Sequence, residues 1–186
     1  MSRSLLQAVL LVDGYNVIGA WSTLQKLRDG DGLEVARRGL VEALVNYSAF
    51  QGFDTQVVFD AQYQDTGSKR EVITRNLSVC YTNFGQTADT YIERACALFR
   101  NDLRKFHKRL IVATSDRAQQ LTVVGYGAEC MSAQQLAFDV ENIARHVHGT
   151  KRSSSRSSRR FLANSLDPAA QQRLAQLRRG LKSQEP

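Results

Sequence analysis

One pattern constrains the fold of this chain more than any other. Short apolar runs, each followed by an acidic residue, alternate with stretches that have the apolar spacing of a helix. The first run, Ala8 to Val12, contains no polar residue and is followed at once by Asp13 and Gly14. A strand without polar alternation is typical of a parallel sheet that is covered on both faces. The repeated pattern therefore predicts an α/β fold of three layers around a central, mostly parallel sheet.

The same criteria predict the remaining elements of the domain. Further strands are expected at residues 55–59, 77–81, 109–113 and 129–131. Apolar residues at helical spacing predict helices at residues 33–50, 87–103 and 117–126, and a last one from Ser132 to about His148. The polar segment over residues 61–71 is expected to be a long exposed loop.

The net charge of +7 is concentrated at one end of the sequence. From residue 151 onward nine basic residues stand against two acidic ones, so residues 1–150 sum to zero. This divides the chain into a domain over residues 1–150 and a basic Ser/Arg-rich linker with a short helical tail over residues 151–186. A basic tail on a neutral domain is typical of proteins that bind polyanions, although a merely solubilising tail has the same composition. The linker residues expected to contact RNA are Lys151, Arg152, Arg156, Arg159 and Arg160.

Several classes of protein are excluded by composition. No apolar stretch is long enough to cross a bilayer, and no export signal is recognised, so no membrane partner is expected. The three cysteines contain no C-x-x-C pair, which argues against a disulfide framework or a zinc site. A reducing cytoplasm is the expected compartment.

Acidic residues recur where the predicted strands end. Asp13 and Asp60 follow the first two strands, Asp89 opens the helix after the third, and Asp116 follows the fourth. Parallel strands end at one edge of a sheet, where open α/β sheets bind their ligands, so these carboxylates are expected to meet. Glu93 lies one helical turn after Asp89 and faces the same way. Each aspartate taken alone is more often a turn or helix-capping residue.

A cluster of carboxylates needs something to offset its charge. Two carboxylates 4 Å apart repel by about 4 kcal/mol at an effective dielectric constant near 20. The cluster must therefore hold protons, pair with basic side chains or bind a metal. Oxygen ligands without suitably spaced histidine or cysteine select a hard cation, Mg²⁺ or Mn²⁺. The metal-binding residues expected on this basis are Asp13, Asp60, Asp89, Glu93 and Asp116, of which Asp60 has the least distinctive surroundings in the sequence.

Three motifs, in this order, resemble those of a known family. They are Val12-Asp-Gly-Tyr-Asn16, Thr87-Ala-Asp-Thr-Tyr-Ile-Glu93 and Val112-Ala-Thr-Ser-Asp116. Together they resemble the YacP-like NYN domains, which are PIN-like metal-dependent nucleases. The similarity covers about residues 5–149 and leaves out the Ser/Arg tail. It implies ribosome-linked endonucleolytic cleavage of mRNA at an acidic Mg²⁺ site whose catalytic residues are Asp13, Asn16, Asp89 and Asp116.

The expected function is therefore that of a Mg²⁺- or Mn²⁺-dependent endoribonuclease that acts on RNA, with the ribosome as a partner. The alternative is a non-catalytic module that binds RNA or the ribosome and keeps the acidic pocket as a relic. No glycine-rich nucleotide-binding motif follows the first strand, and Tyr15 stands where an aspartate-nucleophile phosphatase has its second aspartate.

Two further pairs of residues are candidates for RNA contact, each with a structural alternative. Thr114 and Ser115 either cap the helix that begins at Asp116 or touch a phosphate at its amino end. Lys69 and Arg70 belong either to a basic loop on RNA or to a merely solvated loop.

Overall fold

The computed structural model describes residues 8–61 and 69–146, and the chain divides into two compact units, residues 1–144 and 145–186. The first unit contains one six-stranded sheet in the order β3-β4-β2-β1-β5-β6. Five strands are parallel to one another, and β3 runs antiparallel to β4 at one edge. The strands are β1 (Ala8–Asp13), β2 (Phe53–Phe59), β3 (Lys69–Thr74), β4 (Leu77–Tyr81), β5 (Arg109–Ala113) and β6 (Glu129–Met131).

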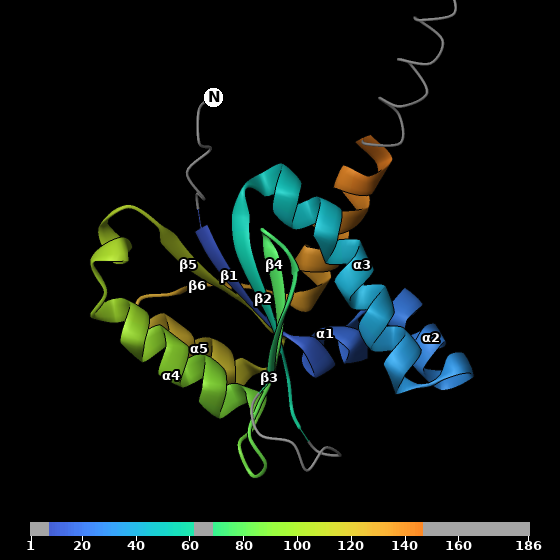
Figure 1. Cartoon of the computed structure of the whole chain (residues 1–186), viewed down its shortest axis with the longest axis horizontal. Helices are drawn as coiled ribbons and strands as arrows, with labels where there is room; N and C mark the ends of the chain where they lie inside the picture. Colours follow the sequence, from blue (N-terminus) through green and yellow to red (C-terminus); the bar gives the residue numbers. More distant parts are fainter. Residues whose placement is uncertain (1–7, 62–68, 147–186) are drawn as a thin grey trace, which may run out of the picture. The chain divides into compact units, whose positions relative to one another are not determined.

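Helices cover both faces of the sheet, which confirms the predicted α/β fold with a central, mostly parallel sheet. Figure 1 shows α4 (Ala88–Arg100) and α5 (Arg117–Gly125) on one side. On the other side lie α1 (Gly14–Ala20), α2 (Ser22–Asp31) and α3 (Leu33–Gln51). A 3-10 helix, η1 (Leu103–Phe106), follows α4, and a last helix over residues 133–146 follows β6.

The core on the α4 side shows why the apolar runs become strands. Leu11, Val58 and Val112, from three neighbouring strands, are almost fully buried against Ile92 of α4 and Val123 of α5. Burying one side chain of this size contributes about 1.5–3 kcal/mol to the free energy that stabilises the fold. The continuous apolar runs are therefore required by burial on both faces of the sheet.

Two parts of the domain differ from the sequence-based prediction. Helices α1 and α2 fill residues 14–31, for which no helix was predicted, and the side chain of Asp13 caps α1 by accepting a hydrogen bond from the Asn16 amide at 3.2 Å. The predicted loop over residues 61–71 is wrong at its end, because β3 begins at Lys69. Most of β3 is exposed on both faces, so the strand lacks the apolar alternation that would have revealed it.

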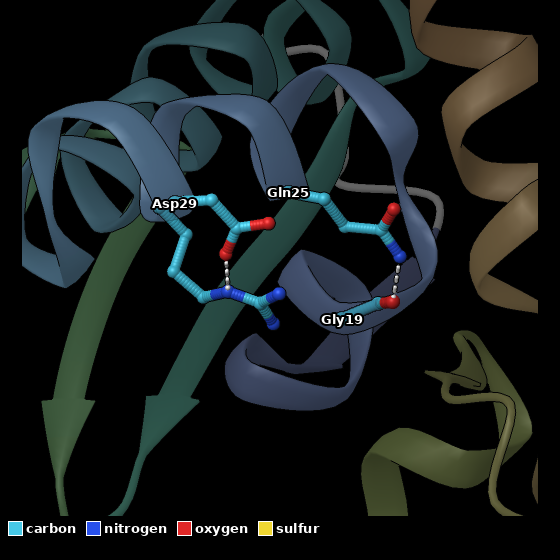
Figure 2. A network of polar contacts seen from close by, with 4 residues as sticks. Gly19, Gln25 and Asp29 are labelled. Carbon is cyan, nitrogen blue, oxygen red and sulfur yellow. Dashed lines mark hydrogen bonds and ion pairs between the residues drawn. The ribbon is translucent and has the colours of Figure 1, made fainter.

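The junction between α1 and α2 is closed by a side chain. Figure 2 shows Gln25 of α2 reaching back to Gly19, whose carbonyl oxygen accepts a hydrogen bond from Nε2 of Gln25. The neighbouring ion pair between Arg28 and Asp29, at 2.8 Å, is exposed and contributes little to stability. This junction holds α1 directly after β1, at the carboxyl end of the sheet.

Within the described part of the chain, no helix has both the length and the apolar character that a membrane span requires. The predicted linker and tail, residues 151–186, lie outside the described residues.

Candidate active site

Four strand-end aspartates lie at the carboxyl edge of the sheet. In the pairing of β1 with β2, Asp13 lies opposite Val58, so Asp60 is two residues further along at the same edge. Asp116 follows β5, which is parallel to β1, by three residues. Asp89 lies in the first turn of α4, directly beside the residue that Asp60 contacts. The fold therefore brings together side chains that are far apart in the sequence.

Asp13 lies at the centre of this group and is 7% exposed. Burial is the largest cause that raises the pKa of its carboxyl to about 6, and the hydrogen bond from the Asn16 amide opposes that rise. Negative charges nearby raise the pKa further, and they belong to Asp89, Asp60 and Asp116. A carboxyl whose pKa is raised by burial and by like charges is typical of a functional site.

The pKa of Asp89 is raised as well. Burial is the main cause, and the charges of three acidic neighbours add to it: Asp116, Asp60 and Glu93. A hydrogen bond from Gln119 opposes the rise. The five predicted metal-binding residues therefore interact electrostatically within one cluster. Within the described residues, arginines form ion pairs with other acids, namely Asp29, Glu34 and Glu129, and not with these five.

Some of the acids also stabilise local structure. Oδ1 of Asp116 accepts hydrogen bonds from the amides of Ala118 at 2.8 Å and Gln119 at 3.0 Å, and so caps α5. A carboxylate oxygen of Asp60 accepts from the Ala88 amide, at the start of α4. The capping role expected of single aspartates is thus present beside the cluster, because helix amino ends favour negative charge.

Asn16 joins α1 to the segment that follows β5. Its Oδ1 accepts a hydrogen bond from the Ser115 amide at 2.7 Å, between residues that are 99 positions apart. Ser115 in turn bonds through its hydroxyl to Gln134, and that hydroxyl accepts from the Ala133 amide. Asn16 therefore holds two sides of the cluster in register.

Thr114 has a structural position. It is fully buried, and its hydroxyl accepts a hydrogen bond from the Asp116 amide at 3.1 Å. The side chain is therefore not exposed to RNA in this structure, and its bond to the Asp116 amide shapes the turn before α5, which Asp116 itself caps. Lys69 and Arg70 are exposed on β3, where they pair with Tyr81 and Cys80 of β4.

Gln119 is a site residue that the sequence analysis missed. Its Nε2 donates to Oδ1 of Asp89 at 2.6 Å, and its own amide donates to Asp116. The side chain is 3% exposed, and its Oε1 is buried without a hydrogen-bond partner. The only signal in the sequence was its position three residues after Asp116, one helical turn into α5.

The donor set of the cluster suits a hard divalent cation. Within the described residues, however, no three histidine, cysteine or acidic side chains lie close enough to ligate one ion together. Mg²⁺ usually keeps several water molecules and takes only one or two carboxylates directly, so a hydrated ion fits this spacing. The unpartnered Oε1 of Gln119, a buried acceptor on the side chain that contacts Asp89, fits the same interpretation because a cation or its water would satisfy it.

Aromatic residues form the wall beside Asp13 on the α1 side. The ring of Tyr15 lies 5.1 Å from that of Phe59, and Phe59 lies 5.9 Å from Tyr81. Nη1 of Arg37 donates to the Tyr15 hydroxyl at 3.2 Å. Gly14 is required here, since a Cβ at that position would lie 2.2 Å from the Phe59 ring.

Comparison with known proteins identifies relatives of the whole domain. The model of the YacP-like NYN domain family matches residues 10–179. The match extends well past residue 149, so the expectation that the tail lies outside the resemblance is wrong. The uncharacterized protein YacP of Bacillus subtilis (strain 168) is 36% identical over 139 residues, which cover 75% of this chain and 78% of that protein.

Two solved structures have the same fold. The crystal structure of Rae1 (YacP) from Bacillus subtilis aligns with a TM-score of 0.67 at 32% identity, over 94% of this chain and 96% of that chain. The crystal structure of a mutant of the same Bacillus subtilis protein aligns with a TM-score of 0.65 at 32% identity, over 92% of this chain and 96% of that chain. An NYN domain indicates a nuclease-like function related to RNA, and nucleases of this type generally use divalent metals.

Proposed function

Because the chain belongs to the YacP-like NYN domain family, we propose that its carboxylate cluster binds Mg²⁺ or Mn²⁺ and hydrolyses phosphodiester bonds within RNA. The observation that supports this most is the burial of Asp13 among three other aspartates whose charges raise its pKa. Such a cluster is costly unless a counter-charge joins it. A divalent ion supplies that charge and is the usual catalyst of phosphodiester hydrolysis.

The five acids of the cluster would bind the cation in two ways. Asp13 and Asp89 are our candidates for direct ligands, with Asp60, Glu93 and Asp116 acting through water. When bound, the cation lowers the pKa of a water molecule and stabilises charge on the phosphate. Hydrogen bonds orient the two direct ligands: the Asn16 amide donates to Asp13, and the Gln119 side chain donates to Asp89.

Cleavage of labelled RNA tests the proposal. Purified protein is incubated with RNA, alone and with ribosomes, in Mg²⁺, in Mn²⁺ and in EDTA, beside Asp13→Asn. We expect cleavage by the wild type with either metal, and none in EDTA or by the variant. Equal cleavage by both proteins, or cleavage that EDTA leaves unchanged, would exclude the carboxylate cluster as the catalytic centre.

The family resemblance and the basic tail both support the ribosome as a partner. We propose that the cytoplasmic substrate is mRNA in association with the ribosome, and that residues 151–186 raise the local concentration of the enzyme there. Deleting residues 151–186 should weaken binding to ribosomes and flatten its dependence on salt, because phosphate contacts release counterions. Binding that is unchanged across the salt range would contradict this role.

A non-catalytic module that binds RNA or the ribosome is the second candidate. It is favoured by the spacing of the acids, since no three described side chains can ligate one ion together as they stand. This candidate predicts binding without cleavage in every arm of the same experiment. Titration of Mn²⁺ into the wild type and Asp116→Asn separates the two before any substrate is known, because only a metal centre loses affinity in the variant.

A further inference from the structure

A hollow of about 440 Å³ lies at the amino-terminal edge of the sheet, opposite the edge of the acidic cluster. Figure 1 shows the connection from α4 to β5 at the outer end of β5, away from the edge where the aspartates meet. Four basic side chains line the hollow together with two aromatic rings: Arg100, Lys105, Lys108, Arg109, Phe99 and Tyr126. Glu129 is the acidic residue among the lining side chains.

This concentration of charge stands out against the rest of the domain. Residues 1–150 are neutral overall, with sixteen basic and sixteen acidic residues. Five of the sixteen basic residues fall within residues 100–109, beside a single acidic residue, Asp102. The loop from α4 to β5 therefore creates a local positive field that the composition of the domain hides.

Two of the four basic groups are held in place by hydrogen bonds to neighbouring atoms. Nζ of Lys105 donates to the carbonyl oxygen of Arg100 at 2.7 Å, at the end of α4. Nε of Arg109 donates to Oε1 of Glu129 at 2.6 Å. Lys108, half-buried, and Arg100, exposed, line the same space. The four cations outnumber the one carboxylate, so the hollow keeps a net positive charge.

We propose that this hollow binds the phosphate backbone of single-stranded RNA, separately from the cleavage centre. The inference rests on the RNA-related function proposed above and adds a contact that the acidic cluster does not provide. Cations beside aromatic rings are the combination that single-stranded nucleic acid uses, with phosphates on the basic groups and bases on the ring faces. Phe99 and Tyr126 are partly buried against the core, which fixes their rings at low entropic cost.

Binding in the absence of metal tests this contact without any need for cleavage. The full-length protein is titrated onto a labelled single-stranded RNA of about 20 nucleotides in EDTA, and affinity is followed by fluorescence anisotropy as salt is raised. The test variant is Arg100→Ala with Lys108→Ala. The matched control, Lys26→Ala with Arg38→Ala, removes two exposed charges from α2 and α3.

The test variant should lose about five-fold in affinity, and its slope of log K against log salt should fall by about 1.4, the share of two phosphate contacts. The control should keep both values near those of the wild type. Arg100→Gln with Lys108→Gln repeats the test if the alanine variant unfolds.

Three results would overturn the proposal. The first is an equal loss of RNA affinity in the test and control variants, and the second is no loss of RNA affinity in either. The third is a test variant that no longer binds polyglutamate but keeps its affinity for RNA. The last result would assign the hollow to an acidic protein. Failure of cleavage in the earlier experiment leaves this measurement unaffected, so the two proposals can fail separately.

Discussion

The two edges of the sheet carry charges of opposite sign, which centre on a buried residue at the carboxyl edge and on exposed residues at the amino edge. At the carboxyl edge Asp13 is 7% exposed and surrounded by other carboxylates. At the amino edge the side chains of Arg109 and Glu129 are 61% and 50% exposed and satisfy each other. An exposed charge costs the fold little, whereas a buried one without a counter-charge costs several kcal/mol. Burial therefore separates a candidate catalytic charge from a candidate docking charge.

The largest expected effect concerns Asp89 at the carboxyl edge. Asp89→Asn removes a charge from the cluster but keeps the shape of the side chain. We expect RNA cleavage to fall by about 10³-fold, about 4 kcal/mol of activation free energy, with RNA affinity in EDTA unchanged. Single-turnover cleavage and anisotropy measure the two quantities.

The exposed residue Asp31 provides the control, since Asp31→Asn should leave the cleavage rate unchanged. The variant at the amino edge, Arg100→Ala with Lys108→Ala, should behave in the reverse way, with weaker binding and a normal rate at saturating RNA. A rate for Asp89→Asn above about a tenth of that of the wild type would break the distinction between the two edges.

The next effect is on stability and follows from the pKa of Asp13. A rise from 3.8 to about 6 means that the metal-free fold loses stability as pH increases through this range, by up to about 3 kcal/mol. Asp13→Asn removes that loss and keeps an oxygen for the Asn16 amide. We therefore expect the variant to be more stable than the wild type at pH 8 and equal to it below pH 4, as measured by urea unfolding in EDTA.

Divalent metal should reverse this order at pH 8. A ligand that binds only the folded wild type stabilises it by about 4.1 kcal/mol at a thousand times its Kd, which exceeds the loss of up to about 3 kcal/mol caused by the Asp13 charge. If Asp13→Asn is less stable than the wild type in EDTA at pH 8, folding does not penalise the charge of Asp13, and the contrast between the two edges is lost.

A smaller effect is expected at Gln119. Gln119→Ala frees Asp89 from its hydrogen bond while leaving all five acids in place. Removal of a residue that orients a metal ligand typically costs 10–100-fold in metal affinity or activity. Titration with Mn²⁺ and the cleavage rate both measure this loss.

Gln135 is a close match for the control. Its Nε2 also donates to an aspartate, Asp139, at 2.8 Å, but at an exposed position on the last helix. Gln135→Ala should therefore leave metal affinity unchanged. Equal losses in the two variants would mean that Gln119 has no special relation to the cluster.

The smallest expected effect tests the positive charge of the hollow at the amino edge. Glu129→Gln removes the carboxylate that pairs with Arg109, so the hollow becomes more positive. RNA affinity should rise about two-fold, and the free energy of unfolding should fall by less than about 1 kcal/mol, as for other exposed ion pairs. A decrease in RNA affinity would contradict the proposed docking surface.

The sequence predicted the sheet and the position of the acids because both follow from burial and from chain direction. Continuous apolar runs such as Ala8 to Val12 require cover on both faces, and parallel strands end at a common edge. The placement of Asp13, Asp60, Asp89 and Asp116 at one edge needed no knowledge of side-chain contacts.

The features that the sequence did not predict depend on tertiary contacts. Helices α1 and α2 are held by a cap at Asp13 and by Gln25, and neither leaves a strong periodic pattern. Gln119 belongs to the site only because α5 packs beside α4. The basic hollow needs residues 100–109 and Tyr126 to meet across the fold.

The bond between Asn16 and Ser115 has a consequence for the timing of assembly. It joins residues 99 positions apart, and Gln119, which orients Asp89, lies later still in the chain. A nascent polypeptide that has emerged only as far as β4 contains Asp13 and its partner Asn16, but it lacks Ala88, which donates to Asp60, and Ser115, which donates to Asn16. The proposed metal site can therefore form only after Gln119, roughly two thirds of the way along the chain, has left the exit tunnel.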